Sequence, residues 1–481
     1  MTGVAVRPLV LSGPLPVVDI DLAEPGAFRR PGGAARPGPS GRALGLVRLH
    51  GRPLGMAEAA GGGPEELWQA LAASARREFA SDERRDPATD GPPESSAGER
   101  TPSSTGGRRQ SSAGGRAAGR GPVLAGAPPV SVIVATRNRV RMLRDCLDSL
   151  LAVEYPRFEV IVVDNAPADT STEELVRGEY GGTPPGHGPA VRYVREPVPG
   201  LARAHNRGLA AARGDIAAFT DDDTLVDRLW LAALVEPFLA DPRTGCVTGL
   251  IVPAELDTEA QVALERHGAF AKGYAPRTWS LRTPPADPLF PFTAGRFGSG
   301  ANMAFRTELL HELGGFDPAT GVGTPARGGD DLLSFFRVLA HGGSLAYEPA
   351  AIVWHRHRRT FEALDAQAFG YGAGFGAYLA GALVHEPRML PALLRRLPGG
   401  VRYVIARNRE RSGPPAAGQS AGRPAAGPAR LARLEIRGLL YGPYGYLRSR
   451  LIERRLRQRT GSGRRHGDLA DPGPRRRGER R

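Results

Sequence analysis

At 481 residues, the chain is long enough for one large domain with appendages or for two to three domains. Its formal net charge is +14, and because Lys272 is the only lysine, nearly all of its basic residues are arginine. The arginines are scattered, and no recognition-helix or aromatic RNA-binding motif accompanies them, which argues against nucleic acid as a partner. Cys146 and Cys246 are too few for a disulfide framework, and neither stands in a metal-ligand pattern. The abundant arginine, alanine, glycine and proline are typical of a GC-rich bacterial genome.

Residues 1–81 combine strand-like runs such as "ALGLVRLHG" with one amphipathic helix around "PEELWQALAASARREFA", and we interpret them as a small accessory module. The first residues lack the basic start and long apolar core of a signal peptide, so we expect a cytoplasmic protein. Residues 82–127 are rich in Arg, Ser, Gly, Pro and Glu and hold almost no large apolar side chains. Such a composition buries too little surface to offset the entropy of ordering, which predicts a disordered linker.

Residues 128–365 alternate between strand and helix patterns. "VSVIVAT" is a continuous apolar run, as expected for a strand covered on both faces, and apolar residues at helical spacing follow it. The next segments are "FEVIVVDN", "VRYVRE", a helix through "LARAHNRGLAAAR", and "DIAAFTDDD". This order predicts an α/β fold, a mostly parallel twisted sheet with helices on both faces.

Polar residues stand where three of these strands end: Thr136 and Arg137 after the first, Asp164 in the second, and residues 221–223 after the last. In such sheets, ligands bind outside the carboxyl ends of the strands. A single polar turn is more often a capped loop than a site. Three polar strand ends that converge at one edge favour a binding site.

The three consecutive aspartates need a partner, because like charges repel and their burial is costly. Asp221 and Asp223 point to the same side of an extended chain, where two carboxylates suit a hard divalent cation, Mg²⁺ or Mn²⁺, that also binds substrate phosphate oxygens. Arg203 and Asn206, on the preceding helix, are suited to phosphate and sugar oxygens. The alternative for Arg203 is an exposed helical charge. The chain has no Walker-type loop and no Gly-x-Gly-x-x-Gly after its first strand, which argues against a P-loop NTPase or a dinucleotide oxidoreductase.

Six motifs in order resemble those of the family 2 glycosyltransferases of GT-A fold, over roughly residues 129–359. They read "VSVIVATRNR", "VIVVDN", "GLARAHNRGLAAARGDIAAFTDDD", "GSGANMAFRTELLHELGGFD", "GGDDLLSFFRVLAHGG" and "YEPAAIVWHRHRR". The resemblance implies a hexosyltransferase-type enzyme that moves a sugar, with inversion, from a nucleotide-diphosphate sugar donor to an acceptor hydroxyl. It also implies that a divalent metal assists the reaction.

The resemblance also assigns roles to residues on the donor side. Thr136, Arg137 and Asp164 are expected to line the nucleoside pocket, and residues 221–223 resemble the DXD motif. Asp223 is the expected direct metal ligand, whereas Asp221, Asp222, Arg203 and Asn206 are expected to contact the nucleotide sugar.

On the acceptor side, Gly300 and Asn302 stand in "GSGAN", which resembles the family's acceptor loop. Asp331 is implied as the base that deprotonates the acceptor, and Asp330 as a residue that orients acceptor hydroxyls. "GDD" stands where the family usually has Glu-Asp, which shortens one carboxylate arm. His355 is implied as a metal ligand, and it aligns better than His357.

The C-terminal region begins with residues 366–410, which we expect to form a helical extension. Its uncharged stretch, residues 366–384, is so rich in glycine and alanine that a packed or interfacial helix is favoured over a membrane span. Residues 411–429 resemble a second disordered linker. Residues 430–459 interleave Leu, Ile and Tyr with arginines, the composition of a basic amphipathic segment on an anionic membrane surface, with a solvated helix as the alternative. Residues 460–481 are predicted to be a disordered basic tail.

These observations predict a metal-dependent inverting glycosyltransferase, cytoplasmic or peripheral at the inner face of the plasma membrane. Its acceptor would be a saccharide or lipid-linked molecule in cell-envelope, polysaccharide or glycolipid synthesis. One alternative is a sugar-phosphate nucleotidyltransferase, although "ATRNRVR" lacks the glycines of that signature. Another is a glycosyltransferase-like binding protein without catalysis, which the retention of Asp223, Asp331 and His355 argues against.

Overall fold

The computed structural model describes residues 11, 13–79, 126–182, 188–268, 270–396, 398–399 and 428–466. The two predicted linkers lie outside these residues, except for the last two positions of each. Most of the predicted basic tail lies outside them as well, but its first residues continue the last helix, which ends at His466.

The N-terminal part is a five-stranded sheet in the order β3-β2-β1-β4-β5 with one helix packed on it. β1 and β4 are parallel, and β4 and β5 form an antiparallel hairpin. The helix buries Leu67, Trp68 and Leu71 against the sheet. The elements are β1 (Val17–Asp21), β2 (Phe28–Arg29), β3 (Ala35–Arg36), β4 (Gly41–Leu49), β5 (Arg52–Gly61) and α1 (Pro64–Phe79).

The central part is a nine-stranded sheet in the order β10-β14-β11-β13-β9-β6-β7-β8, with β12 paired to β14. β6, β7, β8, β9, β11 and β14 run in one direction, while β10, β12 and β13 run against them. The strands are β6 (Val130–Thr136), β7 (Phe158–Asn165), β8 (Ala190–Glu196), β9 (Ile216–Asp221), β10 (Thr224–Val226), β11 (Thr244–Pro253), β12 (Arg277–Ser280), β13 (Asn302–Arg306) and β14 (Ser344–His355).

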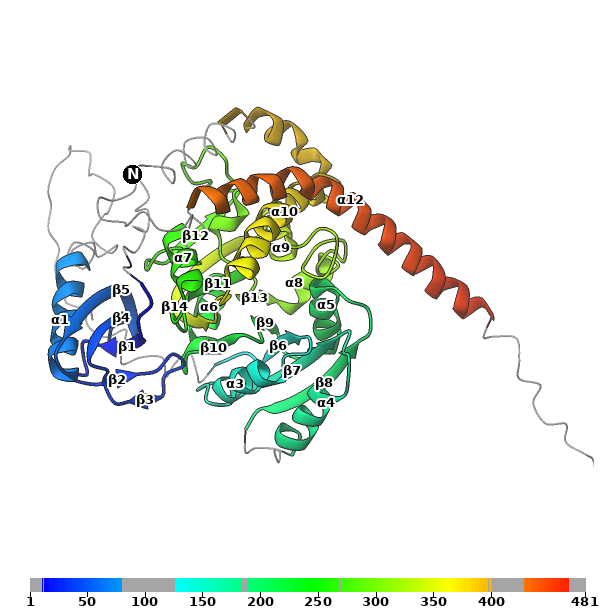
Figure 1. Cartoon of the computed structure of the whole chain (residues 1–481). Helices are drawn as coiled ribbons and strands as arrows, with labels where there is room; N and C mark the ends of the chain where they lie inside the picture. The colour runs from blue at the N-terminus through cyan, green and yellow to red at the C-terminus, as the bar shows by residue number, and fades with distance from the viewer. Residues whose placement is uncertain are drawn as a thin grey trace, which may run out of the picture.

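Helices cover both faces of this sheet (Figure 1). Along β6, Val132 and Val134 pack with residues of α3 and α6, whereas Ile133 packs on the other face with residues of α5 and α9. The predicted α/β fold is therefore confirmed. The helices are α3 (Val140–Leu151), α4 (Ser171–Leu175), η1 (Val176–Tyr180), α5 (Leu201–Ala211), α6 (Trp230–Ala240), α7 (Glu259–His267), η2 (Ala294–Arg296), α8 (Thr307–Glu312), α9 (Asp330–Ala340), α10 (Phe361–His385), η3 (Pro387–Met389) and α12 (Pro428–His466).

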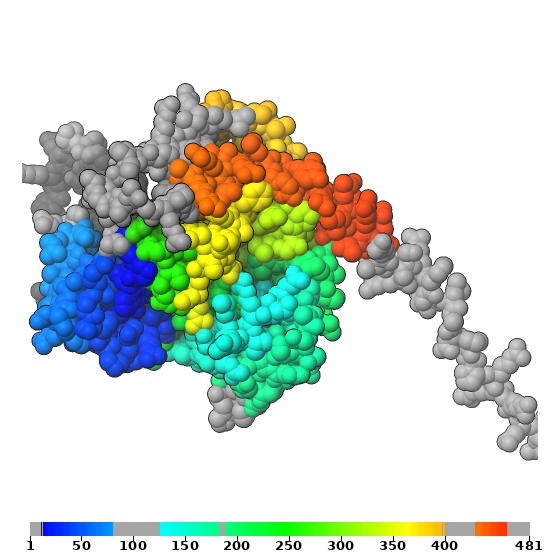
Figure 2. Space-filling view, viewed as in Figure 1, coloured from blue at the N-terminus to red at the C-terminus, as the bar shows by residue number. Residues whose placement is uncertain are grey.

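The N-terminal sheet packs directly against the edge of the central sheet (Figure 2). Leu44 and Leu46 of β4 share one apolar cluster with Ile352 and Trp354 of β14. In the same contact, the buried Arg48 guanidinium bridges two carboxylates, with 2.7 Å to Asp19 and 2.7 Å to Asp227. A buried charge is tolerated when it is paired in this way.

α10 and α12 approach each other backbone to backbone because glycines line their contact. A Cβ atom on Gly376 would lie 2.4 Å from the Leu439 carbonyl oxygen, and one on Gly442 would lie 2.4 Å from the Ala373 carbonyl oxygen. The glycine-rich stretch at 366–384 is thus part of a packed helix, as expected. Within the described residues, no helix is both long and apolar enough to cross a membrane.

Candidate metal and donor site

The polar strand ends predicted from the sequence meet at one edge of the central sheet. β6 lies between β7 and β9, and its parallel pairing places Thr136 beside Asp164 and Ala135 beside Asp221. This register follows from the apolar runs of the three strands, which are buried on both faces. The sheet itself therefore brings together side chains that are far apart in the sequence.

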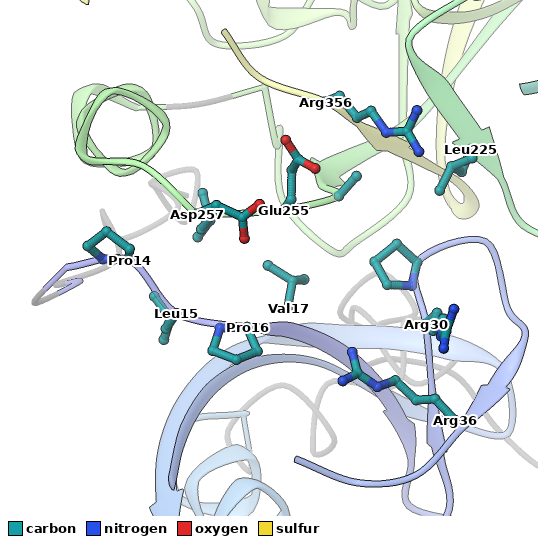
Figure 3. A pocket seen from close by; sticks show the side chains of 13 residues that line it. Pro14, Leu15, Pro16, Val17, Arg30, Arg36, Leu225, Glu255, Asp257 and Arg356 are labelled. Carbon is teal, nitrogen blue, oxygen red and sulfur yellow. The ribbon is translucent and has the colours of Figure 1, made fainter. Parts of the chain in front are cut away.

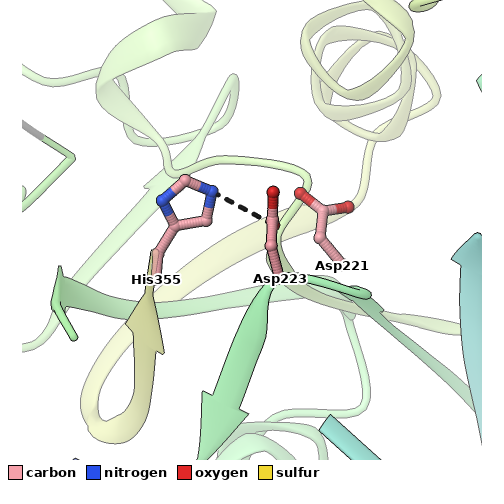
Figure 4. Close-up of side chains that lie close together, drawn as sticks. All are labelled: Asp221, Asp223 and His355. Atoms are coloured by element: carbon pink, nitrogen blue, oxygen red, sulfur yellow. Dashed lines mark ion pairs between the residues drawn. The ribbon is translucent and has the colours of Figure 1, made fainter. Parts of the chain in front are cut away.

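Asp221, Asp223 and His355 form a compact group at this edge, each offering a ligand atom within 4.8 Å of the other two (Figure 4). The pairing of β10 with β14 sets Thr224 opposite His355, which brings the histidine to the aspartates. His355 Nε2 lies 3.3 Å from Asp223 Oδ1. Two carboxylates and one imidazole suit a divalent cation such as Mg²⁺ or Mn²⁺, so the residues present fit the expected metal.

The pKa values of the two carboxylates in this group are shifted in opposite directions. Burial and the neighbouring Asp223 raise the pKa of Asp221 to about 7. Burial would also raise the pKa of Asp223, but His355 and the nearby Arg358 hold it well below its usual range. Burial would lower the pKa of His355, yet the Asp223 carboxylate outweighs it and raises that pKa. A divalent cation at this point would offset the repulsion between the two carboxylates and would favour the ionised form of Asp221.

His357 contacts His355 on the side away from the aspartates. Its Nδ1 lies 3.1 Å from His355 Nδ1, and its Nε2 contacts the buried Glu265 carboxylate. Such an outer partner fixes the ring orientation of a metal-binding histidine. The sequence comparison of the two histidines favoured His355, and the structure places His355 at the aspartates.

Arg139 is a site residue that the sequence analysis missed. Its Nη1 lies 3.0 Å from Asp222 Oδ1 and 3.0 Å from Asp223 Oδ2. Asp222 also accepts a hydrogen bond from Thr136 Oγ1 at 2.7 Å. Asp222 and Thr136 are thus engaged with each other beside the metal group. The segment "TRNR" contains two arginines, Arg137 and Arg139, and nothing in the sequence indicates which of them contacts the aspartates.

Asp164 is buried near the end of β7, while Arg137 is exposed directly after β6. Asp164 Oδ2 accepts a hydrogen bond from Tyr193 at 3.1 Å, and burial raises the pKa of this carboxyl. Among the described residues, its buried Oδ1 has no hydrogen-bond partner. An unsatisfied buried oxygen calls for an explanation, and a ligand hydroxyl would supply one.

Arg203 and Asn206 are engaged elsewhere in this structure. Arg203 forms an ion pair with Glu453 of α12. The Asn206 side chain donates to the Phe316 carbonyl and accepts from its N–H, each at 2.8 Å. Asn206 therefore holds the chain around residue 316 and does not extend toward the metal group.

On the acceptor side, the structure joins Gly300 to Asp331. The Gly300 N–H donates to Asp331 Oδ2 at 2.8 Å, and a Cβ atom on Gly300 would lie 3.3 Å from the Asp331 Cβ. Burial and the neighbouring Asp330 raise the pKa of Asp331 to about 6. Asp330 itself is buried and turns toward His205, away from Gly300.

Asn302 does not reach the site. Its side chain is fully buried and accepts from Trp230 Nε1 while donating to the carbonyls of Leu250 and Ala351. These three hydrogen bonds hold the Asn302 amide within the protein interior. The sequence placed Asn302 correctly next to the glycine loop but could not show that β13 already begins there.

A separate cavity of about 570 Å³ lies between the N-terminal sheet and the β10–β14 edge (Figure 3). Arg30, Arg36 and Arg356 line it together with the carboxylates of Glu255 and Asp257. None of the residues predicted for the site belongs to this lining. The cavity is therefore distinct from the metal group.

Comparison with known proteins defines the class. Residues 131–314 match the family model described as glycosyl transferase family 2. The chain is 28% identical over 265 residues, 55% of its length and 50% of the other protein, to the pre-mycofactocin glycosyltransferase of Mycobacterium tuberculosis. It is 24% identical over 200 residues, 40% of its length and 57% of the other, to the glucosyl-dolichyl phosphate glucuronosyltransferase of Haloferax volcanii.

A solved mannosyltransferase of Pyrobaculum calidifontis, in complex with GDP-Man and Mn²⁺, aligns at 24% identity and a TM-score of 0.44, over 66% of this chain and 87% of its own. The chain spans about half the length of the curated relatives it matches. The match of residues 131–314 to glycosyl transferase family 2 confirms, for this segment, the resemblance seen in the sequence.

Proposed function

We propose that this protein transfers a sugar from a nucleotide-diphosphate donor to an acceptor hydroxyl, with inversion at the sugar carbon. The observation that carries the proposal is the group of Asp221, Asp223 and His355 at the carboxyl edge of a family 2 sheet. Asp223 and His355 would hold a Mn²⁺ or Mg²⁺ ion, which would supply positive charge for the donor diphosphate.

The chain's own cations would assist the departure of the diphosphate. Arg139 lies at the metal group, and Arg358 Nη1 is 3.6 Å from Asp223 Oδ2. Guanidinium groups bind phosphate oxygens with charge-assisted hydrogen bonds, which strengthen as negative charge develops on the leaving group. Thr136, Arg137 and Asp164 would bind the nucleoside at the neighbouring strand ends.

Asp331 would remove the proton from the acceptor hydroxyl. A pKa of about 6 keeps this carboxyl ionised at neutral pH while leaving it basic enough to accept a proton. Each Asp331 carboxylate oxygen accepts one backbone N–H at 2.8 Å, Oδ2 from Gly300 and Oδ1 from Leu332, and each keeps a second lone pair that could accept the proton. A single base and a single displacement give inversion.

The acceptor is proposed to be a saccharide or lipid-linked molecule, and the enzyme to work in the cytoplasm at the inner face of the plasma membrane. The name of the Haloferax relative specifies a dolichyl phosphate-linked glucose as its acceptor, which supports the lipid-linked class. The role proposed for this chain is in cell-envelope, polysaccharide or glycolipid synthesis.

The outward face of α12 supports a membrane location. Leu440, Tyr444, Leu447 and Leu451, spaced four, three and four residues apart, lie on one side of the helix and are 55% to 76% exposed. Exposed arginines stand before and after this stripe, at positions 433, 437, 454 and 455.

The carboxylates of α12 face the other way. His267 Nε2 lies 2.9 Å from Glu435 Oε1, and Glu453 pairs with Arg203. Both acidic side chains of the helix are thus engaged with the protein body, which leaves arginines beside the apolar stripe. Apolar side chains between cations match an anionic lipid surface.

Sedimentation with vesicles tests the membrane location. Replacing the arginines at 433, 437, 454 and 455 with glutamine should weaken binding to anionic vesicles by about 1 kcal/mol per residue at low salt. Neutral phosphatidylcholine vesicles serve as the control surface. Failure of the wild-type protein to sediment with anionic vesicles at low salt would refute this part of the proposal.

Donor hydrolysis tests the chemistry. A panel of nucleotide sugars, with and without Mn²⁺, should reveal one donor that both stabilises the protein against heat and is hydrolysed slowly in the presence of metal. A sugar-phosphate nucleotidyltransferase would instead release pyrophosphate from a nucleoside triphosphate and a sugar phosphate. A non-catalytic binding protein would be stabilised by a donor but would not hydrolyse it.

A further inference from the structure

His205 of α5 and Asp330 of α9 form a buried pair next to the proposed base. His205 Nδ1 lies 3.3 Å from Asp330 Oδ2, and the side chains are 1% and 6% exposed. The imidazole is enclosed by the rings of Phe219 and Phe316, with ring centroids at 5.1 Å and 4.9 Å. In such apolar surroundings a charge without a partner is costly, so each group needs the other.

The polar atoms of this pair have few other partners. Both ring nitrogens of His205 and Oδ2 of Asp330 are buried without a hydrogen-bond partner among the described residues, so the 3.3 Å contact between them is an electrostatic contact and not a hydrogen bond. Buried polar groups are normally satisfied, so each exception calls for an explanation. No role assigned to the metal group or the nucleoside pocket uses His205.

The pair is connected to Asp331 through the first turn of α9. Asp330 and Asp331 begin this helix, and their side chains diverge by about 100°. Asp330 turns inward to His205, and Asp331 turns to the Gly300 N–H. The start of the helix is thereby held from two sides.

We propose that His205 is a positioning residue for glycosyl transfer, which acts through Asp330 to hold the first turn of α9 and to balance the negative charge beside Asp331. His205 touches neither the donor nor the acceptor. The inference rests on the proposed role of Asp331 as the base.

The pH profile of donor hydrolysis distinguishes an electrostatic role of His205 from a purely structural one, because a purely structural role would not shift it. The titratable groups that act on Asp331 are Asp330 on its own helix and His205 on α5, and His205 also acts on Asp221 at the end of β9. Besides burial, Asp330 raises the pKa of Asp331 and His205 lowers it. Replacing the two side chains should therefore shift the pH profile in opposite directions.

The test measures metal-dependent donor hydrolysis against pH in the full chain. His205→Asn keeps an amide near the position of Nδ1 but cannot take up a proton, and it should move the rising limb of the profile up by about one pH unit. Asp330→Asn should move the limb down. The double variant should return toward the wild-type profile, while the KM for donor stays within about twofold in all three.

A matched control is His341→Gln, because His341 is an exposed histidine 3.8 Å from Glu312 and far along α9 from the base. It should leave the profile unchanged. The rising limb of the pH profile could stay in place in both His205→Asn and Asp330→Asn while Asp331→Asn loses hydrolysis. That result would overturn the role of His205 and leave the proposed base intact. If His205→Asn fails to fold, the direction of the Asp330→Asn shift still decides, because a limb that does not move down contradicts charge balance.

Hydrolysis by Asp331→Asn at the wild-type rate would instead overturn the proposed base, and this inference with it. The two failures are therefore distinguishable in one series of variants.

Discussion

The two sides of the site are held in different ways. On the metal side, Asp223 directly precedes β10 and His355 ends β14, and the register of β10 with β14 places them together. On the acceptor side, Asp331 begins a helix and Gly300 lies in a loop, and one hydrogen bond joins them. Backbone pairing positions the first group, whereas side-chain contacts position the second.

This difference has a consequence for substitutions. A strand ladder involves many hydrogen bonds, so the metal group should keep its geometry when single neighbouring side chains change. The acceptor side depends on few contacts, so its geometry and charge should respond to substitutions nearby. We therefore expect that replacing a metal-binding residue abolishes metal binding, and that substitutions on the acceptor side change activity by degrees.

The largest effect is expected for Asp223→Ala. Loss of this ligand should abolish the Mn²⁺-dependent stabilisation of the protein by a nucleoside diphosphate, while melting without ligand changes little. Thermal shift with and without Mn²⁺ measures both. Asp241→Ala, which removes a partly exposed carboxylate paired with Arg243, is the matched control. Unchanged nucleotide binding in Asp223→Ala would show that the metal is held elsewhere.

The next effect is expected for Asp331→Asn, which keeps the size of the side chain but cannot take a proton. Donor hydrolysis should fall about 10²- to 10⁴-fold, with donor and metal binding unchanged. Asp330→Asn should reduce turnover much less. If the two variants behaved the other way round, Asp330 would be the base and its contact with His205 would have to open during the reaction.

The pH dependence of hydrolysis follows from the same carboxyl. Because the pKa of Asp331 is raised to about 6, activity should fall by about tenfold per pH unit below 6 and level off above it. The proton-free form is the active one, so the loss must occur on the acid side. A profile that stays flat between pH 5 and 7 would contradict a base with this pKa.

The smallest effect is expected for Arg139→Gln. Its guanidinium contacts two of the three aspartates, and its loss should weaken nucleoside diphosphate binding by about tenfold in the presence of Mn²⁺. Arg141→Gln is the control, because Arg141 is exposed on the next turn. Equal affinities for both variants would mean that Arg139 only balances charge in the metal-free site.

Much of the site was predictable because the signals are local. Apolar runs marked the strands, and the residues after them marked the edge where Asp221, Asp223 and His355 meet. Arg203, Asn206 and Asn302 were less predictable, since an amide or guanidinium can bind a ligand or bind the protein. In this structure each of them is engaged with other parts of the chain.

The sequence by itself determined the α/β order of the central domain, the resemblance of its motifs to family 2 glycosyltransferases, and the residue types at the metal group, because strand periodicity and short motifs are properties of neighbouring residues. The tertiary structure alone decided contacts between distant segments. Arg48 and Asp227 are 179 residues apart, and Arg203 and Glu453 are 250 residues apart. The choice of partner for such a charge depends on which surfaces pack together. For the same reason, only the fold could set His205 against Asp330.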